Sequence, residues 1–541
     1  MDALLQRARA ALAEYDFYQP PPDELPALAD ALDSAAASND AVPQPVAHLP
    51  EEILLRLAEL LRIGPACIAD AEDLDAEATL QSERLLRHAP SLLRLARPLA
   101  RMCPTPPDPP PREALDLRAR LFIAFGRFTQ RAFSESFTTP PLRALAAETT
   151  SHLLRRPPHV RLPLLRHVLT SHFPRYFKPH PKLNPSTGRV LNRPLGGEAG
   201  TSAWHEDGEE AGGWRREAGL AAVVTLVIQG LEPGEIEDVW PLLLPPLLSY
   251  LDDYDPAHKI LGLSILDSLL KGRVDAALLR RTGVGKVFEQ SLSSCFSALS
   301  HPLSAQLLAS AHPVALELVR LLHPASSSSS PQDDEARFNA LSTLVSTSVV
   351  AAWEFKAGHV AIETVSARAL RGLVSELGAG CVRWLQVVVP HLCDLLEGSA
   401  GAGTSPEVWE MRIEAAWALR GVVEQARVRM GRWEARVVGA VGRCWVEIRE
   451  EDEARTRTSE ERDEVRALEE ALRGVVRALD EVSRREDKAS CLTMIPPASA
   501  PSEVLIEGFC WRKQKSLVAD LRALDEGLFG DLVGPGEVMA Q

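Results

Sequence analysis

Apolar residues spaced three and four positions apart recur along most of the chain, and this spacing is typical of amphipathic helices. Segment 51–62 shows the pattern clearly, because its apolar residues form one helical face: Ile53, Leu54, Leu57, Leu60 and Leu61. The same pattern predicts further helices at about 2–13, 76–100, 112–137, 141–155 and 160–177, and it resumes at residue 215. The fold is therefore predicted to be all-α.

Segments rich in proline, glycine and serine interrupt this pattern and divide the chain. Residues 1–50 are expected to form a weakly ordered N-terminal segment with one short helix, and 51–178 an N-terminal helical region. Residues 179–214 are expected to form an irregular loop, and 215–480 a set of helical repeats with long inserted loops near 326–330 and 398–406. Residues 481–541 are expected to be a tail with one short helix, at about 513–528.

The second half of the chain repeats a short motif. L-R-G-[LV]-V begins at Leu370, Leu419 and Leu472, with steps of 49 and 53 residues, and weaker copies begin at Leu266 and Leu318. The segments before two of these copies also correspond, since W-x5-P-x-L-x2-L occurs at both 240–251 and 384–395. The repeating unit is thus a helix with a proline inside it, here named helix A, followed by a turn and a second helix, named helix B.

Such helix pairs are typical of HEAT and armadillo repeats, in which each pair buries its apolar face against the next. The predicted fold is therefore a HEAT/armadillo-like helical-repeat solenoid with long inserted loops. Small residues in helix B are expected to allow close helix packing: Gly262, Gly372, Gly421 and Gly474. A generic helical bundle with coincident motifs is the alternative.

Composition and charge narrow the function. The 541 residues carry a formal net charge of −15, which disfavours sequence-independent binding to nucleic acid. The eight cysteines include no C-x-x-C pair and are expected to be free thiols. The longest apolar runs are near nine residues, and the N-terminus has no signal-peptide pattern, so no membrane association is expected. These features favour a protein of the cytoplasm and nucleus.

The sequence contains no motif that would support catalysis. The GVGK segment at 283–286 lacks the first glycine and the final Ser or Thr of a phosphate-binding loop. The acidic segment 252–255 lacks the alternation of a calcium loop, and a turn that caps the following helix explains it better. His167 and His172 are five residues apart, outside any H-E-x-x-H motif, and are expected to be ordinary helix residues. We therefore predict no enzyme activity, no cofactor and no metal site.

Two segments carry a more specific resemblance. NPSTGRVLNRPLGG at 184–197 precedes VWPLLLPPLLSYLDDYDPAHKILGLSILDSLL at 239–270, and together they resemble the Tti-two family, the Tel-two-interacting proteins, of the fungal type. The resemblance implies a non-catalytic scaffold subunit of the TTT complex, which also contains Tel-two and Tti-one. It further implies that this complex and the Hsp-ninety system support the maturation and stability of phosphatidylinositol-3-kinase-related kinases, such as the TOR and DNA-damage checkpoint kinases.

Partner binding would need residues on the solenoid surface. The candidate positions lie in the two segments that carry the resemblance: Asn184, Gly188, Arg189, Arg193, Asp252, Asp253 and Lys259. The structural alternative is that the arginines of the loop pair with a carboxylate or with the C-terminal end of a helix.

Two other functions remain open. An importin-like or armadillo adaptor would bind peptides on the solenoid surface, but it would need tryptophans at one constant repeat position, and the tryptophans of the second half do not keep one. They are expected to be core residues. A helical enzyme would need a pocket with convergent ionisable groups, and the loop before Trp214 is the place to find it.

Overall fold

The computed structural model describes residues 2–13, 15–16, 19, 21–37, 49–61, 76–103, 106–129, 138–154, 158–193, 213–325, 330–398, 405–454, 459–493 and 526–533. These residues form helices and turns and no strand, which confirms the all-α prediction. The chain divides into two compact units, Met1–Ser291 (unit 1) and Leu292–Gln541 (unit 2). The division lies inside the predicted repeat region 215–480.

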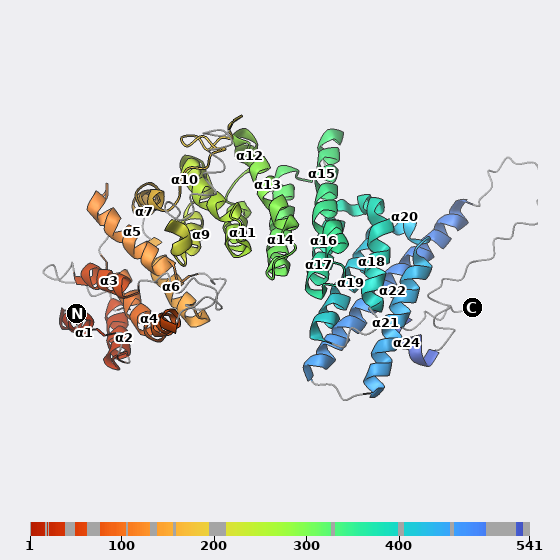
Figure 1. Ribbon diagram of the computed structural model, residues 1–541, viewed down its shortest axis with the longest axis horizontal. Helices are drawn as coiled ribbons and strands as arrows, with labels where there is room; N and C mark the ends of the chain where they lie inside the picture. The colour runs from red at the N-terminus through yellow and green to blue at the C-terminus, as the bar shows by residue number, and fades with distance from the viewer. Residues whose placement is uncertain are drawn as a thin grey trace, which may run out of the picture. The chain divides into compact units, whose positions relative to one another are not determined.

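Unit 1 contains a series of antiparallel and crossing helices (Figure 1). They are α1 (Asp2–Ala13), α2 (Glu24–Ala37), α3 (Leu49–Leu60), α4 (Ala76–Met102), α5 (Arg112–Gly126), α6 (Pro140–Leu154), α7 (Pro158–His167), α9 (Leu220–Gly230), α10 (Pro233–Leu251), α11 (Pro256–Leu270), α12 (Ala276–Thr282) and most of α13 (Val284–Ser297). A π turn, η4 (Val168–His172), and two 3-10 turns, η5 (Phe173–Arg175) and η6 (Gly213–Arg216), connect some of them.

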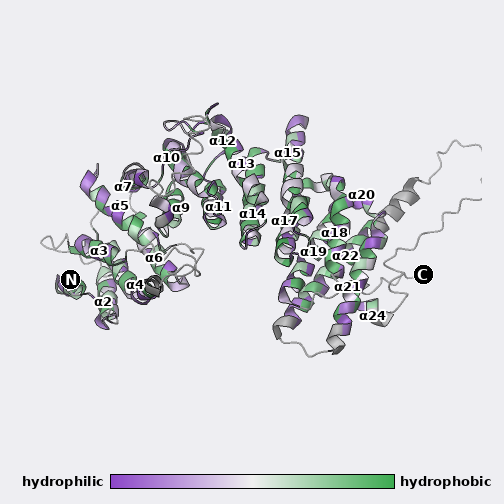
Figure 2. Ribbon diagram, in the orientation of Figure 1, coloured by the Kyte–Doolittle hydropathy of each residue, from purple (hydrophilic) through white to green (hydrophobic). Residues whose placement is uncertain are grey.

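Unit 2 continues with helix pairs. Its elements are α14 (Ser304–Leu322), α15 (Pro331–Leu344), the π turn η7 (Val345–Val350), α16 (Ala351–Phe355), α17 (Val360–Leu377), the 3-10 turn η8 (Gly378–Trp384), α18 (Leu385–Glu397), α19 (Pro406–Gln425), α20 (Arg427–Met430), α21 (Glu434–Ala454), α22 (Ser459–Thr493) and α24 (Glu526–Val533). The helices carry both hydrophobic and hydrophilic residues along their length, as expected for helices that bury one face (Figure 2).

The sequence repeat corresponds to the stacking of helices in unit 2. The L-R-G copies lie in α17, α19 and α22, and these helices pack against one another in that order, with α14 against α17 (Figure 1). The helix A layer forms in the same way, since α18 packs on α21. Each of these two helices also packs on the helix B that follows it, α18 on α19 and α21 on α22. This arrangement is that of a HEAT-like solenoid, and it confirms the predicted fold. In unit 1, α10 and α11 form the corresponding helix A and helix B.

Helix pairs bury their largest side chains between the layers. Trp240 of α10 and Trp445 of α21 are fully buried, and Trp353 and Trp409 are nearly so. The interpretation of these four tryptophans as core residues is therefore confirmed, whereas Trp384, Trp417 and Trp433 of the same region are half-buried. The five cysteines for which the structure describes a side chain are buried free thiols, as predicted: Cys103, Cys295, Cys381, Cys393 and Cys444.

Several local expectations differ from the structure. Helix α2 occupies Glu24–Ala37, inside the segment that was expected to be weakly ordered. Residues 331–335, directly after the predicted insertion at 326–330, are the first turn of α15, and Ser330, inside that predicted insertion, caps the helix through a capping box with Asp333. The inserted serines 326–329 and most of the predicted helix at 513–528 lie outside the described residues; α24 begins at Glu526.

One stretch of unit 2, Val360–Glu397, is long and apolar enough to cross a membrane by length and composition. It comprises α17, η8 and α18. In the structure α17 packs against α14 and α19, and α18 packs against α19 and α21, so the apolar faces of this stretch are used in the helix stack.

Candidate functional site: the corner between α10 and α11 and the loop before it

The turn between α10 and α11 brings together the acidic residues of the sequence Leu251–Pro256. Asp255 is the N-cap of α11, because its carboxylate accepts a hydrogen bond from the backbone N–H of Ala257 at 2.8 Å, and Pro256 takes the first helical position. Asp252 ends α10. The interpretation of this acidic segment as a helix-capping turn, made from sequence, is confirmed.

Asp253 is buried in this corner and is held by Arg215 and His258. Arg215 donates from Nε and Nη2 to the two carboxylate oxygens at 3.0 Å each, and Nδ1 of His258 lies 2.7 Å from Oδ2. The side chain of Asp253 is 0% exposed. Burial alone would raise the pKa of Asp253, but the hydrogen bonds and charges of His258 and Arg215 outweigh it and lower the pKa to about 2.

Asp252 and Lys259 also make internal contacts. The Asp252 carboxylate accepts a hydrogen bond from Ser291 Oγ at 2.5 Å and lies 3.3 Å from His180 Nε2. Burial opposes ionisation of Asp252, but the hydrogen bonds from His180 and Ser291 lower its pKa. Lys259 is only 7% exposed, and its ammonium group donates to the carbonyl of Leu251, the last residue of α10. A cation at a helix C-terminus is favourable because the last carbonyls lack partners.

These contacts correct part of the predicted binding surface. Asp253 and Lys259 are buried and Asp252 is half-buried, so they do not form an exposed patch. Instead, Asp252 contacts His180 near the start of the predicted loop 179–214, and Asp253 contacts Arg215, just after its end. The corner therefore fixes both ends of that loop on α10 and α11.

Aromatic packing reinforces the same attachment. Trp214 lies 4.5 Å from Tyr250 and 5.0 Å from His258 between ring centroids, and it stacks on Phe177 at 6.3 Å. No sequence motif assigns a role to His180, Arg215 or Trp214. Their only signal was that ionisable and aromatic side chains flank a segment rich in glycine and proline.

Residues 182–191 form a compact hairpin-like turn on the surface of unit 1. Asn184 accepts hydrogen bonds from the backbone N–H groups of Ser186 and Thr187, and Leu183 pairs with Val190 in an isolated antiparallel bridge. Gly188 has φ +64°, and a Cβ there would lie 2.8 Å from Cδ1 of the buried Trp240. Glycine is therefore required at this position, both for its backbone conformation and for its contact with α10.

The turn is also joined to the end of α12, where the Val190 N–H donates to the carbonyl of Thr282 at 2.9 Å. Arg189 and Arg193 are exposed, and neither pairs with a carboxylate or a helix end among the described residues. The four predicted loop positions thus have two roles. Asn184 and Gly188 shape the turn, whereas Arg189 and Arg193 extend from it into solvent.

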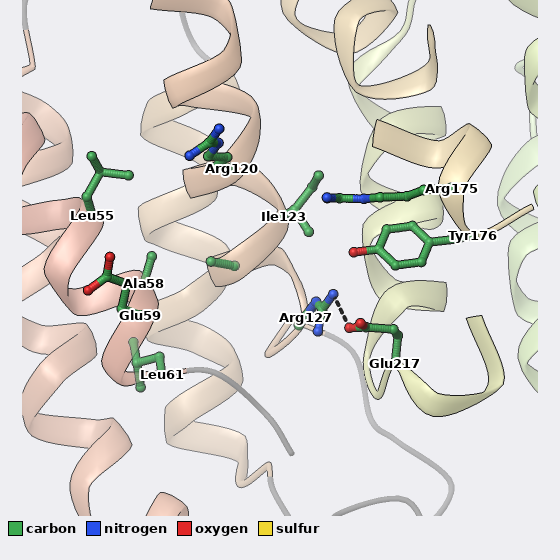
Figure 3. Close-up of a pocket in the computed structure, with 11 residues that line it drawn as sticks. Leu55, Ala58, Glu59, Leu61, Arg120, Ile123, Arg127, Arg175, Tyr176 and Glu217 are labelled. Carbon is green, nitrogen blue, oxygen red and sulfur yellow. Dashed lines mark ion pairs between the residues drawn. The ribbon is translucent and has the colours of Figure 1, made fainter. Parts of the chain in front are cut away.

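A separate pocket of about 360 Å³ lies in unit 1, between α3, α5, η5 and the residues around Glu217 (Figure 3). Arg120, Arg127 and Arg175 line it, with Tyr176 and two glutamates, and Arg127 forms an ion pair with Glu217 at 2.5 Å. The lining contains no thiol, imidazole or aliphatic hydroxyl. Ionisable groups do converge here, but none of the lining residues belongs to the loop 179–214 in which the enzyme hypothesis placed its pocket, and residues 194–212 of that loop lie outside the described residues.

Residues 122–402, just over half of the chain, match the profile of the Tti2 (Tti-two) family. The chain belongs to the Tti2 family. The matched range contains both the corner between α10 and α11 and the loop turn, whereas the pocket lies only partly within it.

Solved structures similar to this Tti2-family chain are helical proteins of low identity. The karyopherin Kap121p, bound to the extreme C-terminus of the protein phosphatase Cdc14p, is 10% identical with a TM-score of 0.41, over 90% of this chain and 41% of the karyopherin. The SYS-1/POP-1 complex is 11% identical with a TM-score of 0.30, over 98% of this chain and 93% of the other. No curated protein matches the chain.

The low pKa of Asp253 predicts acid sensitivity of unit 1. The ordinary pKa of the carboxyl is 3.8 and the folded value is about 2, so the unfolded state binds a proton first as the pH falls. The contribution of Asp253 to stability is then complete above pH 4 and is lost between about pH 4 and pH 2. Urea denaturation at several pH values across this range should show that the free energy of unfolding falls less steeply with pH in Asp253→Asn than in the wild type. An equal pH dependence in the two proteins would contradict the low pKa of Asp253.

Proposed function

We propose that this chain is a non-catalytic scaffold subunit of a TTT-type co-chaperone complex with Tel-two-like and Tti-one-like helical-repeat proteins. In this role it would support the maturation and stability of phosphatidylinositol-3-kinase-related kinases together with the Hsp-ninety system, in the cytoplasm and the nucleus. Membership of the Tti2 family carries the proposal. The helical-repeat architecture supports it, because stacked helix pairs offer a long surface for protein partners.

The loop turn supports the proposal on physical grounds. Its backbone is fixed by Trp240, Thr282 and the Asn184 side chain, while Arg189 and Arg193 are exposed. Binding by such preformed groups loses less conformational entropy than binding by a free loop. Exposed arginines are also among the residues that contribute most to protein interfaces. We therefore place one contact with a protein partner at this turn.

The direct test is reconstitution of the complex. The full chain is co-expressed with the Tti-one-like and Tel-two-like proteins of the same organism, and the mixture is separated by size-exclusion chromatography. Co-elution of the chain in a stoichiometric complex is the expected result. Elution of the chain alone, with all three proteins folded, would rule out the scaffold function.

The charge of the turn provides a second prediction. The double variant Arg189→Glu/Arg193→Glu should weaken binding of the Tti-one-like partner about tenfold or more, because each arginine contact at an interface contributes about 1–2 kcal/mol. Circular dichroism should be unchanged, since both side chains are exposed. The matched control is Arg94→Glu/Arg112→Glu, which makes the same charge change at exposed positions of α4 and α5. Equal affinity of the two double variants would contradict a contact at the turn.

A further inference from the structure

Unit 1 contains a cluster of metal-ligand side chains that the proposed function does not use. Asp116 of α5, His167 at the end of α7 and His172 at the end of η4 bring their ligand atoms within 4.8 Å of one another. Oδ1 of Asp116 lies 3.1 Å from Nε2 of His172 and 3.6 Å from Nε2 of His167. Within the described parts of the chain, no other three His, Cys, Asp or Glu side chains bring their ligand atoms this close together.

The π turn explains how histidines five residues apart share one site. In a regular α-helix, residues five apart point about 140° away from each other. The turn Val168–His172 instead closes with i→i+5 hydrogen bonds, so the two imidazoles lie on the same face, with ring centroids 5.5 Å apart. The second π turn, Val345–Val350, gathers no such set. The combination of the π turn with Asp116 is therefore specific to this site.

Both imidazole Nε2 atoms are buried and directed at the cluster. The side chains of His167 and His172 are 10% and 6% exposed, and apart from the Asp116 carboxylate, at 3.6 and 3.1 Å, neither Nε2 atom has a partner among the described residues. Two buried imidazole nitrogens thus face one carboxylate oxygen, an arrangement that a shared cation would satisfy. Asp116 is oriented from the other side, because Arg120 pairs with its Oδ2 at 2.9 Å and leaves Oδ1 facing the imidazoles.

We propose that Asp116, His167 and His172 bind a Zn²⁺ ion that joins α5 to the turn between α7 and η5. Two imidazoles and one carboxylate, with water as the fourth ligand, are a common zinc coordination set. With metal–ligand bonds of about 2.0–2.1 Å, the ligand atoms of a tetrahedral site lie about 3.3 Å apart. The two separations from Asp116, 3.1 and 3.6 Å, therefore need little adjustment, and the ligand atoms of the two histidines lie within 4.8 Å of each other.

Arg175 determines how readily the site takes the ion. Its Nη2 lies 3.2 Å from Nδ1 of His172 and donates to it, so the imidazole proton lies on Nε2 when no metal is bound. Coordination through Nε2 requires that proton to move to Nδ1, and Arg175 must turn away. Arg175 is exposed and can do so. Because Arg175 and Arg120 both oppose a cation, we expect Zn²⁺ to bind less tightly than at a site without neighbouring arginines.

The test uses the full chain after treatment with a chelator. Isothermal titration with Zn²⁺ near neutral pH should show one site, and Co²⁺ should give the visible absorption of a tetrahedral site. Asp116→Asn and His167→Gln should each abolish both signals, whereas His159→Gln, a change elsewhere in α7, should leave them unchanged. Arg175→Ala should tighten Zn²⁺ binding about tenfold, because it removes the donor to His172.

The results separate a metal site from a hydrogen-bonded cluster. If the wild type and Arg175→Ala both fail to bind Zn²⁺, the three side chains form only internal hydrogen bonds and the proposal is wrong. If Zn²⁺ binds but His167→Gln does not weaken it, the ion lies elsewhere and the proposal is equally wrong. Should a ligand variant unfold, the Co²⁺ spectrum of the wild type and the affinity of Arg175→Ala still decide. None of these measurements depends on partner binding.

Discussion

Replacing Asp253 with alanine is expected to destabilise unit 1 by about 3–5 kcal/mol, which is the cost of removing one partner from a buried ion pair. The variant leaves Arg215 and His258 without their shared carboxylate, and it leaves the Tyr254 N–H without its acceptor at 2.7 Å. Because Arg215 immediately follows the loop 179–214, the loss should also release that end of the loop from α11.

Urea denaturation gives the free energy of unfolding, and hydrogen exchange of the α10 and α11 amides assigns the change to unit 1. Asp238→Ala is the matched control, since Asp238 is 65% exposed and its ion pair with Arg166 is long, at 3.7 Å. It should change stability by less than about 0.5 kcal/mol. In a double-mutant cycle, Arg215→Met should cost much less when Asp253 is already alanine. Additive effects of the two changes would show that the pair is not coupled.

The solenoid was predictable because its signal repeats. Leu370, Leu419 and Leu472 begin the same motif, and the structure places them in α17, α19 and α22, which stack in that order. A repeat with a step near 50 residues stays recognisable when residues are inserted between helices. Inserted residues change the length of the step but not the apolar face of each helix. Periodicity and proline position were therefore sufficient to identify the helix pairs.

The roles of the predicted binding residues could not be obtained in the same way. Asp253 and Lys259 follow a turn and carry charge, which in sequence resembles an exposed acidic and basic surface. Their burial depends on Arg215, 38 residues away from Asp253, and on the carbonyl at the end of α10. No local pattern encodes such distant pairs. The exposed arginines of the turn could be predicted more easily, because they lie in a polar segment with no apolar period.

Backbone geometry explains the other differences. The spacing of His167 and His172 suggests separate positions on a regular helix, and only the π turn brings them together. Ser330 follows four serines, so the composition of the segment concealed the capping box with Asp333 that starts α15. In both places the sequence contains the relevant residues, but the local backbone state determines what they do.

Two glycines of the helix B series allow a second large effect on stability to be predicted, because Gly→Ala is expected to destabilise at one of them and to stabilise at the other. A Cβ at Gly262 in α11 would lie 2.7 Å from the Leu251 nitrogen and 2.9 Å from the Tyr250 carbonyl carbon. These are backbone atoms, so the helices must separate, at a cost near the upper end of the 1–3 kcal/mol typical of overpacking. The gain in helix propensity from Gly to Ala is about 1 kcal/mol. Gly262→Ala should therefore destabilise unit 1 by about 2 kcal/mol.

Gly421, another helix B glycine, lies in α19 at a different repeat position, two residues after Leu419, and a Cβ there would meet only Val374 Cγ1, at 3.9 Å. Overpacking is absent, so Gly421→Ala should stabilise unit 2 by up to about 1 kcal/mol. The two Gly→Ala variants should thus differ by about 3 kcal/mol and in sign, each measured against the wild type by urea denaturation with hydrogen exchange in α11 and α19. Destabilisation by both variants would show that close packing is a property of every repeat. Stabilisation by both would show that α10 and α11 can separate without cost, and that the contact at Gly262 does not restrict the corner.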